Sequence, residues 1–296
     1  MKEFICNLCP RECGVVRGEE GRGWCGMGAD PLIARAAPHY DEEPVISGTK
    51  GSGAVFFSGC SLKCCFCQNY DLSHKGWGKR VSADRLREIY FELIGQGVHN
   101  INLVNPTHYA EAVLESLEGG LPVPVVWNSG GYEKVETLRR FEGKVQVYLP
   151  DLKYISSESA RKYSKAKDYF DFAAPALKEM LRQTGPVELD EDGIIRRGTI
   201  VRHLILPGCA EESMRILDFI RAELPGAWVS LMAQYLPFGD APGIDELGRR
   251  LTPEEYEMVA DHLSEIGLED GFIQELSSSD EKYIPKFDLT GVQKEN

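Results

Sequence analysis

The sequence predicts an α/β fold, namely a partial (β/α)6 barrel preceded by a small cysteine-rich segment. Three observations lead to this prediction. Short apolar runs alternate with amphipathic helical windows along most of the 296 residues. Most of these runs do not alternate between apolar and polar residues, as is typical of parallel strands buried on both faces. Eight of the nine cysteines lie before residue 68, and four of those occupy a stretch too short to bury a core of its own.

The expected elements follow in chain order. Strands are predicted at 54–57, 100–104, 123–127, 145–149, 200–206 and 228–234, with a weaker one at 169–172. Helices are predicted at 83–95, 109–117, 133–141, 157–166 and 211–224, with a further one that ends at 183–185. Asp192-Gly193 predicts a hairpin turn within 187–197, and Thr252 with Glu255 predicts a capping box that opens the last helix. About six βα units make an open or partial barrel.

The chain divides into three parts by composition. Residues 1–30 form a cysteine-rich, metal-binding segment, and a metal or the main body is needed for it to fold. Residues 31–50 are interpreted as a connector. Residues 51–296 are assigned to the partial barrel with a C-terminal extension.

Charge and hydropathy exclude several classes of function. The formal net charge is −13, and no run of Lys or Arg interrupts it, which disfavours nucleic acid and membrane surfaces as partners. No apolar window approaches the roughly 18 residues of a membrane span, and residues 1–7 lack the apolar stretch of a secretory signal. We therefore expect a cytoplasmic protein. Its cysteines are then better explained as metal ligands than as disulfides, because the cytosol keeps thiols reduced.

Cys60, Cys64 and Cys67 have the spacing C-x3-C-x2-C directly after the first core strand. Three thiolates can bind three irons of a 4Fe-4S cluster, and the fourth iron then keeps an open position for a ligand. The alternative is a zinc or structural-cluster site with Cys65 or a remote residue as the fourth ligand.

With Phe66 just before the third cysteine, this loop resembles the signature of the radical S-adenosylmethionine (SAM) superfamily. Across its length the chain is similar to the pyruvate formate-lyase activating enzyme-like branch, with an extra cysteine-rich amino terminus; residues 56–60, 100–108 and 201–208 carry the likeness. The resemblance implies that the open iron binds SAM and passes one electron to its sulfonium. The resulting 5′-deoxyadenosyl radical abstracts a hydrogen atom.

The resemblance also implies which residues contact SAM: Phe66, Asn105, Thr107, Asn128, Gly130, Asp151, Lys153 and Arg202. Asn128 stands where activating enzymes carry an aspartate. Asn105 to His108 replace the usual Gly-Gly-Glu; here Asn105 and Thr107 supply oxygens that accept hydrogen bonds from an ammonium group, and His108 is expected to begin the next helix. The plainer interpretation of Asp151 and Lys153 is an ion pair at a strand end.

The four remaining amino-terminal cysteines are Cys6, Cys9, Cys13 and Cys25. Four thiols with two short spacings suit either tetrahedral zinc or a second iron-sulfur cluster, and we favour zinc slightly. Cys65 is expected to be a small buried hydrophobe, and Cys209 a buried or exposed thiol rather than a hydrogen-atom relay or metal ligand.

We therefore expect a radical SAM oxidoreductase of the activating-enzyme type that acts on a polypeptide and installs a glycyl radical. One alternative is radical modification of a peptide side chain or small molecule, and another is a non-catalytic iron-sulfur carrier. The expected partners are a protein or peptide substrate and a one-electron donor of the flavodoxin or ferredoxin type. We expect an acidic donor to approach basic residues near the cluster loop, namely Lys63, Lys75, Lys79 and Arg80.

Overall fold

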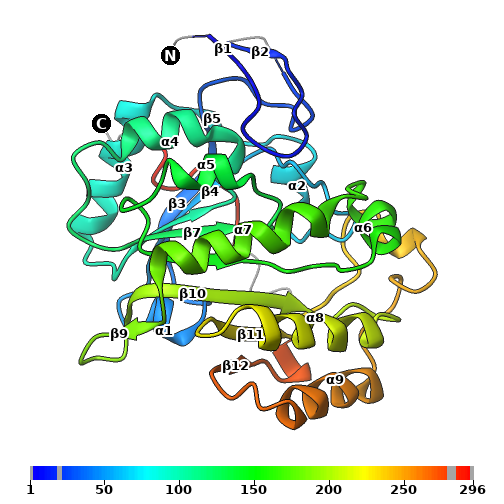
Figure 1. Cartoon of the computed structure of the whole chain (residues 1–296). Helices are drawn as coiled ribbons and strands as arrows, with labels where there is room; N and C mark the ends of the chain where they lie inside the picture. Colours follow the sequence, from blue (N-terminus) through cyan, green and yellow to red (C-terminus); the bar gives the residue numbers. More distant parts are fainter. Residues whose placement is uncertain (1–2, 19–21, 279–284, 294–296) are drawn as a thin grey trace.

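A computed structural model describes residues 3–18, 22–278 and 285–293 of the chain. Its centre is a ten-stranded, mostly parallel sheet with helices along its outer face, so the predicted α/β class is confirmed (Figure 1). In the described residues, the hydrogen-bonded order runs from β12 at one end to β5 at the other, and no pairing closes it into a complete barrel. A separate two-stranded hairpin, β1 (Phe4–Ile5) with β2 (Val16–Arg17), lies in the cysteine-rich segment.

Seven strands of the sheet are parallel to one another. In spatial order they are β4 (Ser52–Phe57), β6 (Ile101–Val104), β7 (Val125–Ser129), β8 (Val147–Pro150), β10 (Ile195–Leu204), β11 (Trp228–Met232) and β12 (Gly271–Ile273). Three further strands join the sheet through antiparallel pairing: β3 (Leu32–His39) pairs with β4, β5 (Lys79–Arg80) with β3, and β9 (Glu188–Leu189) with β10. All seven parallel strands therefore end at the same edge of the sheet, where polar side chains from different strands meet.

Helices connect the parallel strands. They are α1 (Pro44–Ser47), α2 (Tyr70–Ser73), α3 (Ala83–Gly95), α4 (Ala110–Ser116), α5 (Val135–Arg139), α6 (Ser157–Ser164), α7 (Tyr169–Thr184), α8 (Ala210–Glu223) and α9 (Pro253–Glu265). Short 3-10 turns are η1 (Thr107–Tyr109), η2 (Ala241–Gly243) and η3 (Leu276–Ser278). Within the part of the chain that the structure describes, none of the helices has the length and apolarity needed to cross a bilayer.

Several local predictions are confirmed to the residue. Helix α3 spans 83–95, and it buries Leu86, Ile89, Tyr90 and Leu93 on one face while Ser82 caps its first turn. The Thr252–Glu255 capping box opens α9. The turn at Asp190–Gly193 joins β9 to β10 as the expected hairpin.

The predicted strand at 169–172 is wrong, because these residues begin helix α7. The aromatic run there satisfies a strand pattern locally. Over a longer window, however, Tyr169, Ala173, Ala176, Leu177 and Met180 recur every three or four residues, and all are buried. The buried face of the helix therefore decides the structure over local propensity.

Residues 31–50, interpreted as a connector, contain β3 and α1 instead of an irregular linker. β3 pairs antiparallel with β4, from Ile33 opposite Phe57 to His39 opposite Ser52. The chain therefore leaves β3 at the amino-terminal end of the parallel strands. From there, residues 40–43 run to the inner face of the sheet, and one of them lies at the candidate functional site.

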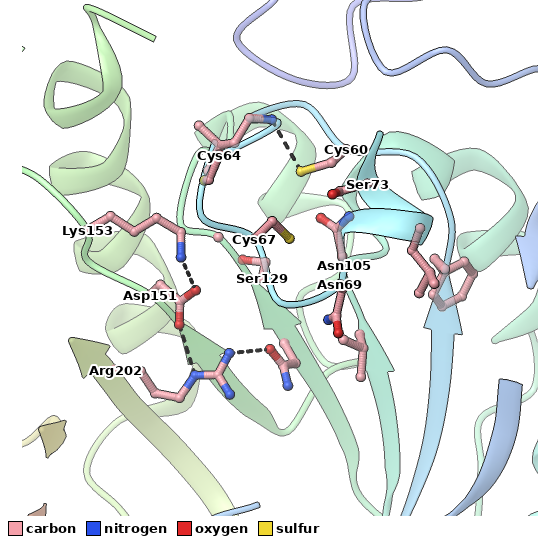
Figure 2. Close-up of a pocket in the computed structure, with 16 residues that line it drawn as sticks. Cys60, Cys64, Cys67, Asn69, Ser73, Asn105, Ser129, Asp151, Lys153 and Arg202 are labelled. Atoms are coloured by element: carbon pink, nitrogen blue, oxygen red, sulfur yellow. Dashed lines mark hydrogen bonds and ion pairs between the residues drawn. The ribbon is translucent and has the colours of Figure 1, made fainter. Parts of the chain in front are cut away.

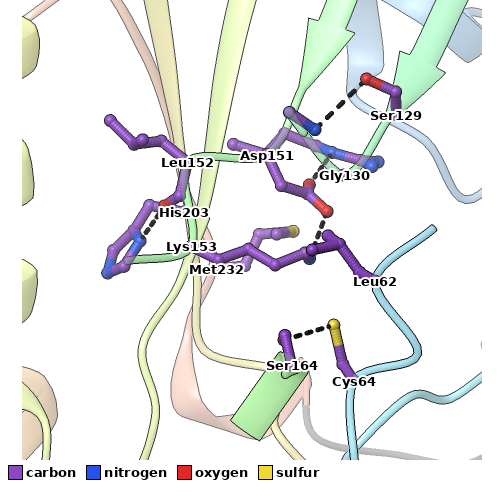
Figure 3. Close-up of polar contacts among 12 residues, drawn as sticks. Leu62, Cys64, Ser129, Gly130, Asp151, Leu152, Lys153, Ser164, His203 and Met232 are labelled. Carbon is purple, nitrogen blue, oxygen red and sulfur yellow. Dashed lines mark hydrogen bonds and ion pairs between the residues drawn. The ribbon is translucent and has the colours of Figure 1, made fainter. Parts of the chain in front are cut away.

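His203 on β10 makes folding pH-dependent. It is 2% exposed, and its Nδ1 lies 2.7 Å from the Leu152 carbonyl (Figure 3). Its Nε2 lies 2.8 Å from Ser213 Oγ. Burial lowers its pKa from 6.5 to about 4. An unfolded histidine binds a proton more readily than the buried His203 does. The contribution of neutral His203 to the free energy of unfolding is therefore complete above pH 6.5 and is lost as the pH falls toward 4.

We expect the free energy of unfolding of the wild type to lose about 2–3 kcal/mol between pH 7 and pH 4.5 through His203 alone. His203→Gln keeps polar contacts without a titratable ring, so its stability should fall less steeply over this range. Urea unfolding of both proteins at the two pH values measures the difference. Parallel pH profiles for the two proteins would contradict the prediction.

Candidate functional site

The loop that follows β4, residues 59–69, carries three of the predicted metal ligands, and we call it the cysteine loop. Cys60, Cys64 and Cys67 all line one cavity at the carboxyl ends of the parallel strands (Figure 2). The backbone N–H of Leu62 donates to Cys60 Sγ over 3.3 Å, and Ser164 Oγ donates to Cys64 Sγ over 2.9 Å (Figure 3). Both donors help to hold the two sulfurs at this cavity.

Side chains from four successive strand ends form the opposite wall of the cavity. Asn105 follows β6, and Asn128 lies near the end of β7, with Gly130 just beyond that strand. Asp151 and Lys153 follow β8, and Arg202 lies on β10. The cavity measures about 130 Å³. Phe66 lies beside it in the adjoining hollow, with its ring centroid 6.1 Å from that of Tyr235. The structure thus gathers most of the positions that the resemblance implied.

A chain of ion pairs crosses the floor of this cavity. Lys153 Nζ lies 2.5 Å from Asp151 Oδ2, and Arg202 Nε donates to Asp151 Oδ1 over 3.0 Å (Figure 2). All three side chains are at most 17% exposed. Burial opposes the charge of Asp151, but Lys153 and Arg202 together hold its pKa below the usual value. Asp151 is therefore a carboxylate with two cations beside it.

Sequence reasoning missed Glu42, which completes this ion-pair chain. Its Oε2 lies 3.2 Å from Arg202 Nη1, and its Oε1 accepts hydrogen bonds from the amides of Asn102 and Asn128 over 3.0 and 3.1 Å. Burial raises the pKa of Glu42, and Arg202 opposes the shift. The residue lies in the 31–50 stretch, far in sequence from its partners, and it is preceded and followed by other acidic residues that give no signal of burial.

Asn128 has a defined role in this arrangement. Its Oδ1 accepts a hydrogen bond of 2.6 Å from Arg202, while its Nδ2 donates to Glu42. An aspartate there would place a third carboxylate beside Arg202. The amide instead links Glu42 and Arg202 through a donor and an acceptor, which a carboxylate cannot do.

Thr107 lies elsewhere, in contrast to the expectation that it contacts the cofactor. Its hydroxyl donates to Glu133 Oε1 over 2.7 Å in a buried polar group that also includes Trp127. The turn of η1 points the side chain under the strand end rather than into the cavity. His108, in the same turn, precedes α4 as expected, and its Nε2 lies 2.7 Å from the Ser58 carbonyl.

The four cysteines of residues 1–30 lie near one another. Cys6, Cys9 and Cys25 are buried, and Cys13 is partly exposed. The guanidinium of Arg17, itself 1% exposed, donates to both Cys6 Sγ and Cys25 Sγ over 3.6 Å, and the N–H of Trp24 donates to Cys13 Sγ over 3.2 Å. A buried cation with N–H donors suits a group of thiolates on a metal, which carries excess negative charge.

Both cysteine sets have the donor chemistry for thiophilic metals, since thiolates select zinc and iron-sulfur clusters. Among the described residues, no three Cys, His, Asp or Glu side chains already stand at the separations of a bound metal ion.

The other two thiols are not part of either set. Cys65 is partly exposed and packs against the apolar cluster beneath the cysteine loop, as a small hydrophobe would. Cys209 precedes α8 and lines a separate hollow with Tyr163 and Glu212. Burial raises its pKa to about 11, which keeps it a thiol at neutral pH.

Together, the fold and the site define an α/β protein with a thiol-bearing cavity at the carboxyl edge of a mostly parallel sheet. The chain belongs to the same family as the uncharacterized protein MJ0674 of Methanocaldococcus jannaschii. The two are 32% identical over 276 residues, which cover 89% of this chain and 75% of that protein. No known family model matches the chain.

Two solved structures resemble parts of the chain. One is methylornithine synthase (PylB), with a TM-score of 0.48 and 18% identity over 69% of this chain; the matched part spans 59% of the PylB chain. The other is a domain of a pyruvate-formate lyase-activating enzyme from Bacteroides vulgatus, with a TM-score of 0.37 and 14% identity over 65% of this chain and 91% of that domain.

Proposed function

We propose that the protein is a radical SAM enzyme whose 4Fe-4S cluster is held by Cys60, Cys64 and Cys67. The observation that carries the proposal is that these three thiols line the same cavity as Asp151, Lys153 and Arg202. Three thiols would leave one iron of such a cluster open to a ligand, and the charged wall lines the same cavity. When bound, the cluster supplies the electron that cleaves SAM reductively to methionine and a 5′-deoxyadenosyl radical.

The protein's own residues bind and orient the cofactor. Lys153 and Arg202 present cations, and Asp151 and Glu42 present anions, so this wall complements both the carboxylate and the ammonium of an amino acid. Gly130 and Asn105 line the same cavity. Asn105 Nδ2 donates to the Gly59 carbonyl over 2.7 Å and so fixes the start of the loop. Burial of the charged groups keeps water from competing for these contacts.

We further propose the activating-enzyme branch for this chain, with a polypeptide substrate on which it installs a glycyl radical. An open sheet supports this proposal, because its cavity is accessible to a loop of another protein. The proposed partners are therefore a protein or peptide substrate and a one-electron donor of the flavodoxin or ferredoxin type. The cytoplasm, whose reducing conditions suit thiolate ligands, is the proposed location.

The proposal also includes a second metal, zinc or an iron-sulfur cluster, at Cys6, Cys9, Cys13 and Cys25. Its support is the burial of three of these thiols together with the N–H donors of Arg17 and Trp24. A site of this kind would stabilise a segment that has few apolar residues of its own.

Anaerobic reconstitution followed by iron, sulfide and zinc analysis tests both proposals. We expect about four irons per chain at the cysteine loop, and either one zinc or about four more irons at the amino-terminal thiols. With SAM and dithionite, the loaded protein should release 5′-deoxyadenosine. A loaded protein that cleaves no SAM under strong reductant would instead be an iron-sulfur carrier.

A further inference from the structure

The cysteine-rich segment is bound directly to the cysteine loop through Arg11. This arginine lies in sequence between Cys9 and Cys13. Its guanidinium donates to three backbone carbonyls: Ser61 over 2.8 Å, Lys165 over 2.6 Å and Ser164 over 3.1 Å. Ser61 belongs to the cysteine loop, between Cys60 and Cys64, so one side chain joins the two cysteine sets.

Arg11 is also fixed at its own end. Its backbone N–H donates to Cys9 Sγ. Its guanidinium stacks over the Trp24 ring, 4.4 Å from the centroid, and lies 5.3 Å from the Tyr132 centroid. Trp24 in turn donates its backbone N–H to Cys13 Sγ. The position of Arg11 thus depends on two of the four amino-terminal thiols.

Two of the three carbonyls that Arg11 binds, those of Ser164 and Lys165, belong to the end of α6, which also holds the cysteine loop. The Tyr163 carbonyl accepts from the Cys65 N–H over 2.8 Å, and Ser164 Oγ donates to Cys64 Sγ. Lys165 ends the helix in the left-handed conformation, with φ of 52°. A guanidinium fork at this helix end satisfies carbonyls that would otherwise lack partners.

Two further contacts lie on the other side of Cys60. Gly59 has φ of 86°, and a Cβ there would come within 2.2 Å of Met27 Cγ, so Met27 rests directly on the start of the loop. Arg17, the donor to Cys6 and Cys25, also donates to the His108 carbonyl over 3.0 Å, and His108 contacts the Ser58 carbonyl. The loop is thus flanked by the cysteine-rich segment at both Gly59 and Ser61.

We propose that the cysteine-rich segment holds the cysteine loop in place, with Arg11 as the positioning residue. Through Arg11, metal binding at the amino-terminal thiols affects the iron-sulfur cluster. This inference rests on the proposed function. The geometry also gives the direction of the effect. A guanidinium near the loop, and the N–H and O–H donors to sulfur that it keeps in place, favour the more negatively charged reduced cluster. Arg11 therefore raises the reduction potential of the cluster and slows its loss.

The test compares wild type with Arg11→Ala, Arg11→Lys and Cys13→Ala. Arg161→Ala, an exposed arginine on the same helix α6, is the matched control. Each protein is reconstituted anaerobically, and three quantities are measured: the midpoint potential, the electron paramagnetic resonance spectrum of the reduced cluster, and the rate at which a chelator removes cluster iron. Circular dichroism establishes that each variant is folded.

We expect Arg11→Ala to lower the midpoint potential, to change the resonance spectrum and to release cluster iron about tenfold faster, equivalent to ~1.4 kcal/mol. Arg11→Lys should not rescue these properties, because an ammonium cannot bind three carbonyls in a planar fork. Cys13→Ala should shift the potential in the same direction, and Arg161→Ala should match wild type.

The proposal would be wrong if folded Arg11→Ala had the midpoint potential, resonance spectrum and iron release of wild type. It would also be wrong if Arg11→Ala shifted the midpoint potential and Cys13→Ala did not. Failure of the proposed function gives a different result, since wild type itself would then bind no cluster or cleave no SAM. The two proposals are therefore separable in one set of samples.

Discussion

Cys64→Ala is expected to abolish reductive cleavage of SAM and to leave the reconstituted protein without its cluster at the cysteine loop. Cys64 is 7% exposed, and its sulfur accepts a hydrogen bond from Ser164 at the wall of the cavity. A cluster with only three protein thiols has no spare ligand, so loss of one leaves two irons without protein support. Iron analysis and 5′-deoxyadenosine release measure the result.

Cys65→Ala is the matched control, because it removes a thiol from the same loop one residue away. The backbone of Cys65 is held on both sides: its N–H donates to the Tyr163 carbonyl, and its carbonyl accepts from the Asp240 N–H, each over 2.8 Å. Its thiol therefore cannot swing into the cavity to replace Cys64. Cleavage that survives in Cys64→Ala, or disappears in Cys65→Ala, would contradict the assigned ligand set.

Arg202→Ala should lower the free energy of unfolding by about 3–5 kcal/mol, because it leaves the buried Asp151 and Glu42 without their shared cation. The Arg202 side chain is 15% exposed, and its two carboxylate partners are 14% and 10% exposed. An uncompensated buried carboxylate costs far more than an exposed pair contributes. Denaturant unfolding of the metal-free protein measures the loss.

Arg140→Ala provides the control for this measurement. Arg140 binds Glu111 through two hydrogen bonds of 2.7 and 2.8 Å, but the pair is 38% and 34% exposed. Its removal should cost about 1 kcal/mol or less. Equal losses of unfolding free energy in Arg202→Ala and Arg140→Ala would contradict the prediction, because they would show that burial does not increase the cost of breaking the Arg202 ion pairs. Glu42→Gln in the Arg202→Ala background should restore part of the stability, since it removes one of the unpaired charges.

The parts of the fold that depend on local sequence were predictable. Periodic apolar residues defined α3, and a capping box defined the start of α9. The apolar runs marked all the parallel strands except β12, whose three residues are too few to give a pattern. The aromatic residues at the start of α7 led to the wrong prediction of a strand, because the buried face of this helix is recognisable only over its 16 residues. β3 was missed because its alanines and Pro38 have low strand propensity, which an antiparallel partner overrides.

The candidate site, too, was only partly predictable from the sequence. The cysteine loop follows from its spacing, and Asp151, Lys153 and Arg202 follow from the family resemblance; these residues do meet around one cavity. Glu42 could not be predicted, because its partners are 60 to 160 residues away. The side-chain direction of Thr107 depends on the 3-10 turn η1, which no sequence pattern marks. Long-range contacts and local backbone geometry therefore account for what the sequence left open.

The outer side of β3 is covered by residues 286–292, from the far end of the chain. The Ala36 N–H donates to the Thr290 carbonyl over 2.8 Å, the Leu289 N–H donates to the Ala34 carbonyl over 3.0 Å, and Val292 is 2% exposed in the core. Such contacts join residues more than 250 positions apart. Because contacts so distant in sequence slow folding, we expect this edge to form late. Without residues 286–292, the stretch of β3 around Ala34 and Ala36 would present unpaired backbone groups, the kind of strand edge at which proteins aggregate.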